Sequence, residues 1–238
     1  MIPQLHLFDY SGETPEENID IDTRLLQASN KAVKENRLNE CAFLRFWESK
    51  DYFVCLGASN KAKTEVNIPN TTKDNIPILK RCSGGGTVVQ GPGCMNYCVV
   101  LPISYNANLK SIDNTNKFIM NKTQKAIQAV LTTNDKVMIQ GFTDLTINNI
   151  KFSGNAQRRL NRSILFHGSI LYQFNIQKIS DYLAFPSRHP KYRKKRSHEE
   201  FCQNINLTKK EIKASLLKEW QCKKTSPLSS KTIIELYL

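Results

Sequence analysis

The chain has 238 residues, of which 40% are hydrophobic, and its mean hydropathy is −0.43, so it can bury a core of its own as one large domain. No window approaches the roughly 18 uninterrupted apolar residues that a membrane helix needs, and the N-terminus lacks the features of a secretion signal. We therefore expect a cytoplasmic protein with no membrane partner. The formal net charge of +13 predicts an anionic partner, which could be a nucleic acid, an acidic protein or a nucleotide.

The seven cysteines are an odd number and include no Cys-x-x-Cys pair. They are scattered through apolar segments, so we expect reduced thiols rather than disulfides. Cys94 and Cys98 lie four residues apart, but the histidine nearest to them in the sequence is His167. This spacing does not fit zinc ligation, and we predict no metal site built from these side chains.

The N-terminal part of the chain predicts one helix and two strands. Residues 17–36 have the periodicity of an amphipathic helix, which we expect to cover a sheet. Two aromatic and β-branched runs, at 42–47 and 52–56, are separated by a short polar segment. They predict a β-hairpin that finishes at Gly57.

The middle of the chain alternates short strands with one long helix. Strands are predicted at 78–81 and 96–101, and we expect these two to pair. Residues 113–132 have apolar side chains on one face and predict a helix, and the next strand begins at 137–140.

A hairpin pattern follows. Residues 144–147 and 150–153 alternate around the polar turn Asn148-Asn149, and Gly154 is expected to end the second strand.

Two further elements are predicted toward the C-terminus. Residues 163–172 form an apolar strand that we expect to be interrupted at Gly168. Thr208 and Glu211 have the spacing of a capping box, which predicts a last helix over 209–220.

Three consecutive glycines follow a short strand in the run Arg-Cys-Ser-Gly-Gly-Gly at 81–86. Arg81 is cationic, Ser83 carries a hydroxyl, and bare glycine amides can donate several hydrogen bonds to a phosphate or a carboxylate. Glycine is costly inside regular structure, so a triplet favours a loop that approaches a ligand closely. Taken alone, the run could equally be a hairpin turn with a solvated basic edge.

Three segments occur together in the chain. The first is the run at 81–96 that begins with the triple glycine motif and ends at Asn96. The second is Asp144-Leu145, and the third is Lys-Phe-Ser-Gly-Asn-Ala-Gln-Arg at 151–158, with His167-Gly168 beyond it. Their order and spacing resemble those of the lipoate-protein ligase and octanoyltransferase superfamily.

The resemblance extends from a first helix at 18–26 to about Tyr172. It implies an α+β fold with mixed and antiparallel sheets flanked by helices, the class II synthetase-like catalytic domain of biotin and lipoate ligases. We expect this catalytic domain over 1–185, and over 186–238 a basic loop and a C-terminal helical extension packed on the same domain.

The resemblance implies that Lys151 is the catalytic residue, which contacts the acyl carbonyl and a phosphate oxygen. An acyl adenylate has a negative phosphate beside an electrophilic carbonyl, so a fixed ammonium stabilises the oxyanion as it develops. Nucleotide binding is implied for Asp144, Lys151 and Arg158. The residues with an implied role in substrate binding are Arg81, Ser83, Gly84, Gly85, Gly86, Asn96, Ser153, Gly154, Asn155, Ala156, His167 and Gly168.

Each of these polar residues has a structural alternative. Lys151 alternates with Ile150 and Phe152, so it could be an exposed strand lysine. Asp144 could be an Asx-turn residue, Arg158 could only solvate the start of a helix, and His167 could be a hydrogen-bonded core histidine.

The reaction implied is attachment of lipoate or octanoate to a lysine of a small acidic lipoyl carrier domain. The acid would pass through an acyl adenylate made from ATP and Mg²⁺, or be taken as preformed acyl-AMP. Ligases of this superfamily often carry a separate C-terminal accessory domain, and only a short segment follows Tyr172 here. Adenylation could therefore need a separate accessory subunit.

Thioester transfer is less favoured, because no cysteine lies between Cys98 and Cys202 and we expect Cys82 and Cys98 to be packed thiols. Three other functions stay open: a transferase without its own adenylation, a biotin-type ligase, and a non-catalytic binding module. Against biotin, the chain lacks a Gly-Arg-Gly-Arg loop. The basic run at 188–196 could dock an acidic partner, with nucleic acid the less favoured one.

Overall fold

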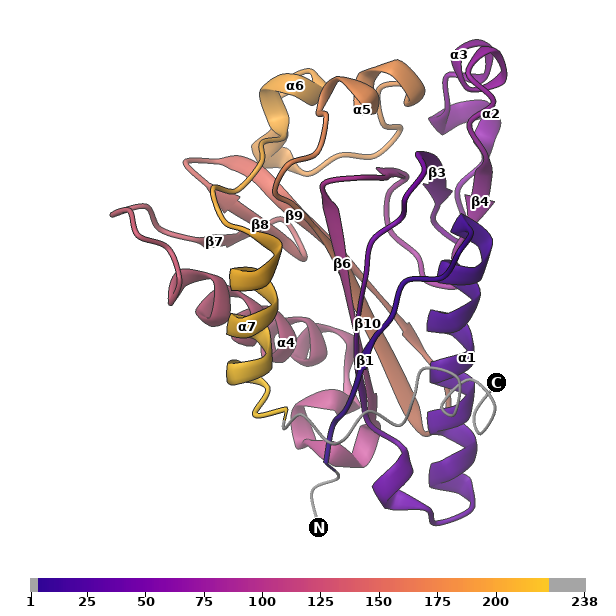
Figure 1. Cartoon of the computed structure of the whole chain (residues 1–238), viewed down its shortest axis with the longest axis vertical. Helices are drawn as coiled ribbons and strands as arrows, with labels where there is room; N and C mark the ends of the chain where they lie inside the picture. The colour runs from indigo at the N-terminus through magenta and orange to yellow at the C-terminus, as the bar shows by residue number, and fades with distance from the viewer. Residues whose placement is uncertain (1–3, 223–238) are drawn as a thin grey trace.

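The computed structural model describes residues 4–222 and contains two sheets (Figure 1). In spatial order, the large sheet consists of β1 (His6–Asp9), β2 (Phe43–Trp47), β6 (Cys94–Pro102), β10 (Ser163–Leu171), β9 (Ile150–Arg159), β8 (Asp144–Ile147) and β7 (Met138–Gln140). The small sheet consists of β4 (Ile78–Lys80), β3 (Phe53–Leu56) and β5 (Val88–Gln90). The β1–β2 and β3–β4 pairs are parallel and the other pairs are antiparallel, which confirms the predicted mixed α+β class.

Three long helices cover the large sheet: α1 (Pro15–Lys34), α4 (Ile112–Gln128) and α7 (Lys209–Glu219). The shorter ones are α2 (Ala62–Glu65), α3 (Ile68–Lys73), α5 (Gln177–Tyr182) and α6 (His198–Phe201), with 3₁₀ turns η1 (Leu38–Glu40), η2 (Ile103–Tyr105), η3 (Ala107–Lys110) and η4 (Lys191–Arg193). The predicted helices at 17–36 and 113–132 are confirmed with small shifts of their ends. The capping box of Thr208 and Glu211 is also present at the start of α7.

The two faces of the large sheet have different helices against them. Strand side chains alternate between faces, and on β6 Cys98 and Val100 pack with α1 while Tyr97 and Val99 pack with α4 and α7. Figure 1 shows α1 on one side of these strands and α4 with α7 on the other. These are called below the α1 face and the α4 face.

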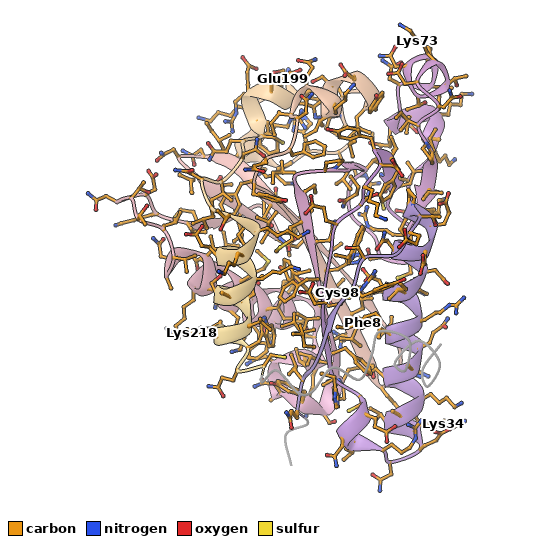
Figure 2. All side chains as sticks on the ribbon, viewed as in Figure 1. Phe8, Lys34, Lys73, Cys98, Glu199 and Lys218 are labelled. Atoms are coloured by element: carbon orange, nitrogen blue, oxygen red, sulfur yellow. The ribbon has the colours of Figure 1, made fainter. Side chains whose placement is uncertain are left out.

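Most side chains in the interior of the molecule are apolar, and charged side chains gather at its rim. In Figure 2 the buried side chains of Phe8 and Cys98 lie inside, and the exposed ones of Lys34, Lys73, Glu199 and Lys218 lie at the periphery. Among the residues described, we find no helix with both the length and the apolar character needed to cross a membrane.

The predicted hairpin of 42–47 and 52–56 is wrong. β2 lies in the large sheet between β1 and β6, whereas β3 lies in the small sheet between β4 and β5. Both strands are buried along their whole length, so each needs a neighbour on both edges, which a hairpin alone cannot supply. The polar segment between them is held away from a tight turn, because Glu48 accepts hydrogen bonds from Gly93 N–H (2.8 Å) and from Tyr172.

The predicted pairing of 78–81 with 96–101 is also wrong. β4 pairs with β3, and β6 pairs with β2 and β10. β4 is short and only partly buried, as suits an edge strand. β6 is buried throughout and requires two long neighbours.

The hairpin around Asn148 and Asn149 is confirmed, and both residues have positive φ (52° and 64°), which suits a two-residue turn. The strand ends predicted at Gly154 and Gly168 are wrong, because β9 and β10 continue through them. Both glycines give room to polar side chains instead. A Cβ on Gly168 would lie 1.7 Å from Asn155 Oδ1, and one on Gly154 would lie 2.8 Å from Lys151 Nζ.

The domain boundary at 185 stays a prediction. Residues on its two sides are in contact, since the Gln203 N–H donates to the Lys151 carbonyl (2.8 Å) and the Ile205 N–H donates to the Leu171 carbonyl (2.8 Å). The part of the predicted extension beyond residue 222 lies outside the described residues.

Candidate functional site

Lys151, the second residue of β9, forms an ion pair with Asp144, the first residue of β8. Lys151 Nζ lies 2.7 Å from Asp144 Oδ1, and the two side chains are only 25% and 15% exposed. The hydroxyl of Tyr192, in η4, donates to the other carboxylate oxygen (2.7 Å). Asp144 therefore holds the ammonium from one side while Tyr192 holds Asp144.

A break in strand register decides where Lys151 points. Leu145 pairs with Ser153, but Thr146 pairs with Lys151, so one extra residue of β9 is inserted between the two pairs. A bulge of this kind turns a side chain toward a different face. Because Lys151 and Gly154 are three residues apart, they would face opposite sides of a regular strand, yet Lys151 Nζ lies beside Gly154.

The pKa of Lys151 is raised above its ordinary value. Burial, the largest single influence, acts in the opposite direction, but the neighbouring Asp144 carboxylate outweighs it through its charge and its hydrogen bond. Lys151 is therefore an ammonium at neutral pH. It can donate hydrogen bonds and stabilise negative charge, but it cannot serve as a base or a nucleophile in that state.

Arg81 fixes the glycine loop through hydrogen bonds to its backbone carbonyls and to Ser83. Its side chain is buried, and its Nη2 donates to the carbonyls of Gly84 (2.6 Å) and Gly86 (2.8 Å), while Nε donates to Ser83 Oγ (3.0 Å). In a trans peptide the N–H points opposite to the C=O, so the Gly85 N–H points away from Arg81. Within residues 4–222 the amides of Gly84, Gly85 and Gly86 donate to no other group. The direct ligand contact expected of Arg81 stays a prediction.

The glycine loop lies against β9 and β10 on the α1 face. A Cβ on Gly85, where φ is +90°, would lie 3.5 Å from the Ala156 Cβ. Ser83 Oγ lies 2.6 Å from Nε2 of His167, and His167 is paired with Ala156 across the strands. Ser83 and His167 thus meet each other although they are far apart in the sequence.

These groups form one row along β9. Gly154 and Ala156 are two residues apart and share a face, which separates them by about 6–7 Å. The Lys151–Asp144 pair lies at Gly154, the glycine loop lies at Ala156, and Arg158 continues the same face with an exposed side chain. A ligand with two anionic or polar groups a few ångströms apart would fit this row.

Other expected site residues lie elsewhere. Asn155 faces α4: its Oδ1 accepts from Tyr97 (2.5 Å) and its Nδ2 donates to the Thr143 carbonyl (2.6 Å) and to Ser153 (3.2 Å). Gly168 gives Asn155 its space on that face. The site residues expected from the sequence are therefore divided between the two faces. Ser153, Asn155 and Gly168 lie on the α4 face, behind the strands that carry the row. Whether they also contact a ligand stays a prediction.

Asn96 is buried, and its side chain exchanges two hydrogen bonds of 2.9 Å with the Gln90 amide. This reciprocal pair satisfies the amide internally. A contact between Asn96 and a ligand would have to break it, so the role expected of Asn96 stays a prediction too.

Cys202 lies beside Lys151, which the sequence did not indicate. The two residues form an isolated parallel bridge. Burial raises the pKa of the Cys202 thiol, although Lys151 and Arg193 act in the opposite direction. Burial likewise raises the pKa values of Cys82 and of the fully buried Cys98. All three are protonated at neutral pH, which disfavours a thioester mechanism.

Tyr192 and Asp22 are polar residues of the site region that sequence reasoning missed. Tyr192 is the aromatic residue inside the basic run, where charge alone drew attention. Asp22 is an acidic residue within the apolar stripe of α1, between Ile21 and Leu25. An acidic residue on the helix face that packs against a sheet is unusual, and this position was the signal that could have identified Asp22.

A family model described as the lipoyl protein ligase A/B catalytic domain matches residues 14–221. The chain belongs to this family. Its curated relatives include the inactive lipoate–protein ligase 2 of Plasmodium falciparum, which is 26% identical over 229 residues, or 84% of this chain and 58% of that protein. The probable lipoate-protein ligase A of Mycoplasma genitalium is 28% identical over 152 residues, or 63% of this chain and 43% of that protein. The lipoyl protein ligase A/B domain seen here therefore spans less than two thirds of either relative.

Solved structures with the same fold include a bipartite lipoate protein ligase and its E2 lipoyl domain from Thermoplasma acidophilum. The matched chain has a TM-score of 0.70 and 19% identity, with coverage of 99% of this chain and 92% of that one. A lipoate-protein ligase A bound with ATP has a TM-score of 0.69 and 19% identity, with coverage of 100% and 94%. Both likenesses support the predicted class II synthetase-like fold of this lipoyl protein ligase A/B family member.

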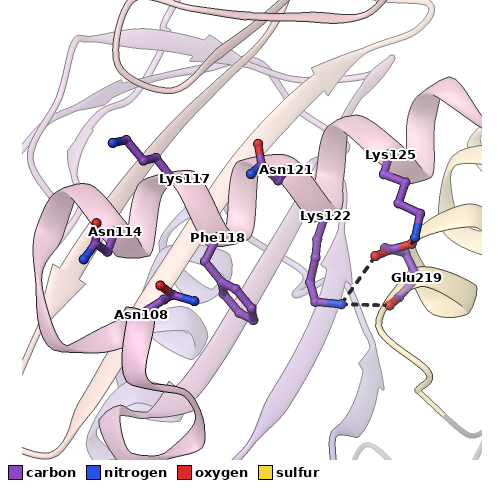
Figure 3. A pocket seen from close by; sticks show the side chains of 8 residues that line it. All are labelled: Asn108, Asn114, Lys117, Phe118, Asn121, Lys122, Lys125 and Glu219. Carbon is purple, nitrogen blue, oxygen red and sulfur yellow. Dashed lines mark hydrogen bonds and ion pairs between the residues drawn. The ribbon is translucent and has the colours of Figure 1, made fainter.

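A depression of about 310 Å³ lies away from this row, between η3, α4 and α7 (Figure 3). Its lining includes Phe118 and the side chains of Lys122 and Lys125, which pair with Glu219. It contains none of the residues expected to bind substrate.

Proposed function

We propose that this lipoyl protein ligase A/B family member attaches lipoate or octanoate to a lysine of a small acidic lipoyl carrier domain, through an acyl adenylate. The observation that carries the proposal is the row on β9, where the Lys151 ammonium and the glycine-loop amides share one face. The row supplies positive charge and hydrogen-bond donors a few ångströms apart, as an acyl phosphate anhydride requires. The ligase names of relatives and the E2 lipoyl domain in a neighbouring structure point the same way.

The transfer step needs stabilisation of one developing charge. A neutral amine of the carrier attacks the acyl carbonyl, a C–N bond forms, the C–O bond to AMP breaks, and the amine loses a proton to solvent. Negative charge builds first on the carbonyl oxygen and then on the departing phosphate. In this proposal Lys151, an ammonium paired with Asp144, stabilises both charges, and the Gly85 amide is a second donor.

The acyl chain requires an apolar surface next to the glycine loop. A cluster of Trp47, Phe53, Cys55, Ile19, Leu79 and Val88 supplies it, and Arg81 Nη1 ties the loop to this cluster through the Cys55 carbonyl (3.2 Å). Ile19, Leu79 and Val88 are only partly buried. Covering them with a hydrocarbon chain would stabilise the complex by about 0.8 kcal/mol per buried CH₂.

ATP would use the polar part of the row. Arg158 and Lys151 are the two cations along the row on β9, and Asp144 is the carboxylate beside Lys151. Within residues 4–222 no group of three or more His, Cys, Asp or Glu side chains is arranged to hold a metal ion. We propose that Mg²⁺ enters with the phosphates of the nucleotide, where it would neutralise phosphate charge during adenylation, and that Asp144 is the carboxylate nearest to it.

The basic run at 188–196 is only partly available to a carrier domain. Arg193 is buried between the rings of Phe185 and Phe201, at 4.7 and 4.8 Å from their centroids. Arg196 donates to the Asn149 carbonyl (2.9 Å). The exposed cations of the run are Arg188, Lys191, Lys194 and Lys195. We propose that these four attract the acidic carrier.

Charge reversal at Lys194 and Lys195 is expected to weaken carrier binding. The double variant Lys194→Glu/Lys195→Glu should raise KM for the carrier by about tenfold. The KM should also depend less on salt, because exposed charges at the rim of an interface mainly raise the rate of association. A matched control is Lys110→Glu/Lys117→Glu, which makes the same charge change at two exposed lysines on η3 and α4, outside the run. Equal effects of the two double variants would refute a docking role for the run.

The proposed activity is tested by mass spectrometry of a lipoyl carrier domain. The chain is incubated with the carrier, lipoate, ATP and Mg²⁺, and in parallel with the carrier and premade lipoyl adenylate. A mass gain in both supports a complete ligase, and a gain only with the adenylate supports a transferase that depends on an accessory subunit. No gain in either, with octanoate and biotin tried as well, would contradict the proposed function.

A further inference from the structure

A buried carboxylate on α1 reaches the glycine loop through one histidine. Asp22 is 2% exposed, and its Oδ2 lies 3.1 Å from Nδ1 of His167. The other ring nitrogen, Nε2, lies 2.6 Å from Ser83 Oγ. Asp22 Oδ1 accepts from Arg45 Nη1 (2.6 Å), and Arg45 is fully buried. The contacts run without a gap from the core to the loop.

The partners at the two ends decide where the protons lie. Arg81 can only donate, so its Nε–H points at Ser83 Oγ. The Asp22 carboxylate can only accept, so a neutral His167 ring has its proton on Nδ1, and its Nε2 then accepts from the Ser83 hydroxyl. Burial alone would raise the pKa of Asp22, but the Arg45 guanidinium and His167 hold it below the usual range. The carboxylate is therefore available to accept from Nδ1–H.

The order Ser–His–Asp is that of a hydrolase triad, but access differs. Ser83 is 0% exposed, and its oxygen already accepts a hydrogen bond from Arg81. An attacking hydroxyl must reach a substrate carbonyl, and this one is covered. The array is suited to orientation rather than nucleophilic attack.

We propose that Asp22 is a positioning residue for the acyl site. By holding His167 in the Nδ1–H tautomer, it directs the Ser83 hydroxyl and fixes the start of the loop 83–86 in the shape that receives the acid. The acyl role rests on the proposed function. The effect on tautomer and loop order does not depend on it.

The test compares wild type with Asp22→Asn, whose amide can donate to Nδ1 and so allow the Nε2–H tautomer. The ring tautomer is read by ¹⁵N NMR, since the chain has four histidines and His167→Gln identifies the signal. We expect Nδ1–H in wild type and Nε2–H in Asp22→Asn. The amides of Gly84, Gly85 and Gly86 should exchange about tenfold faster in the variant, as loss of one buried hydrogen bond would cause.

The functional readout separates binding from turnover. In Asp22→Asn the KM for lipoate should rise about tenfold while kcat changes by less than about threefold, the signature of lost ground-state binding. The matched control is Asn18→Ser. Asn18 lies one turn earlier on α1, is buried, accepts from Arg45 (2.8 Å), and within residues 4–222 has no hydrogen bond to His167. This variant should lower thermal stability and leave the tautomer unchanged.

Three results would overturn the proposal: an Nε2–H tautomer in wild type, an unchanged tautomer and exchange rate in Asp22→Asn, or an equal rise in KM in Asn18→Ser. The first needs no variant, so a folding failure of Asp22→Asn leaves the proposal testable. If wild type transfers no acyl group, the proposed function fails, and the tautomer and exchange measurements still decide the role of Asp22.

Discussion

Lys151→Ala is expected to lower the rate of transfer from lipoyl adenylate by roughly 10²–10³-fold, the usual effect of losing one preorganised oxyanion donor. The reason is that Lys151 is an ammonium fixed by Asp144 at 2.7 Å on the face that carries the glycine loop. The measurement is single-turnover transfer to a lipoyl carrier domain, followed by mass spectrometry.

The fold should survive this change. The Lys151 side chain is one-quarter exposed, and Asp144 keeps its hydrogen bond from Tyr192. The control is Lys151→Met, which keeps the apolar stem and removes the charge; it should be as slow as Lys151→Ala. Wild-type rates in either variant, with unchanged thermal unfolding, would refute the role of Lys151.

Gly154→Ala is expected to slow transfer by about tenfold to 10²-fold, because misplacement of a catalytic group by about 1 Å can have an effect of this size. The added Cβ would lie 2.8 Å from Lys151 Nζ and 2.9 Å from its Cε. These atoms are the far end of a flexible side chain, so the ammonium moves and the backbone does not. The free energy of unfolding, measured with denaturant, should change by less than about 1 kcal/mol.

A double-mutant cycle separates this effect from general damage. If Gly154→Ala acts only by displacing the ammonium, it should have no further effect in a Lys151→Ala background. Additive losses in rate would show that Gly154 acts by another route, such as direct contact with the substrate.

The transfer assay has one incubation with ATP and one with premade lipoyl adenylate, and together they test whether this chain is active. One relative of this chain is named an inactive ligase, so similarity to the family does not establish turnover. In the present chain Lys151, Asp144 and the glycine loop are all placed on one face. We therefore expect the transfer step to be retained even if adenylation depends on a second subunit.

Local patterns predicted most of the elements. The helices at α1, α4 and α7 were recognisable because their apolar faces and the cap at Thr208 are encoded within one or two turns. Strand partners were not recognisable in the same way. β2 and β3 are neighbours in the sequence and lie in different sheets, since two buried strands have the same pattern whichever strands they pair with.

For the site, too, the sequence identified the residues but not their arrangement in space. The motif residues at 81–86, Asp144 and 151–158 could be selected from the sequence, because glycine and cationic residues are costly or unusual in those positions. Their faces could not be assigned. The bulge beside Lys151 changes the alternation of β9, and a one-residue shift exchanges the two faces of a strand.

By itself, the sequence determined the three long helices, the turn at Asn148-Asn149, the motifs and the positive charge, because each depends on neighbouring residues. The tertiary structure decided which motif residues share the α1 face, that Ser153, Asn155 and Gly168 brace the site from the α4 face, and that Asp22, Tyr192 and Cys202 join the region. These contacts link residues as far apart as Asp22 and His167. Long-range contacts depend on how whole strands and helices pack, and no local pattern encodes that.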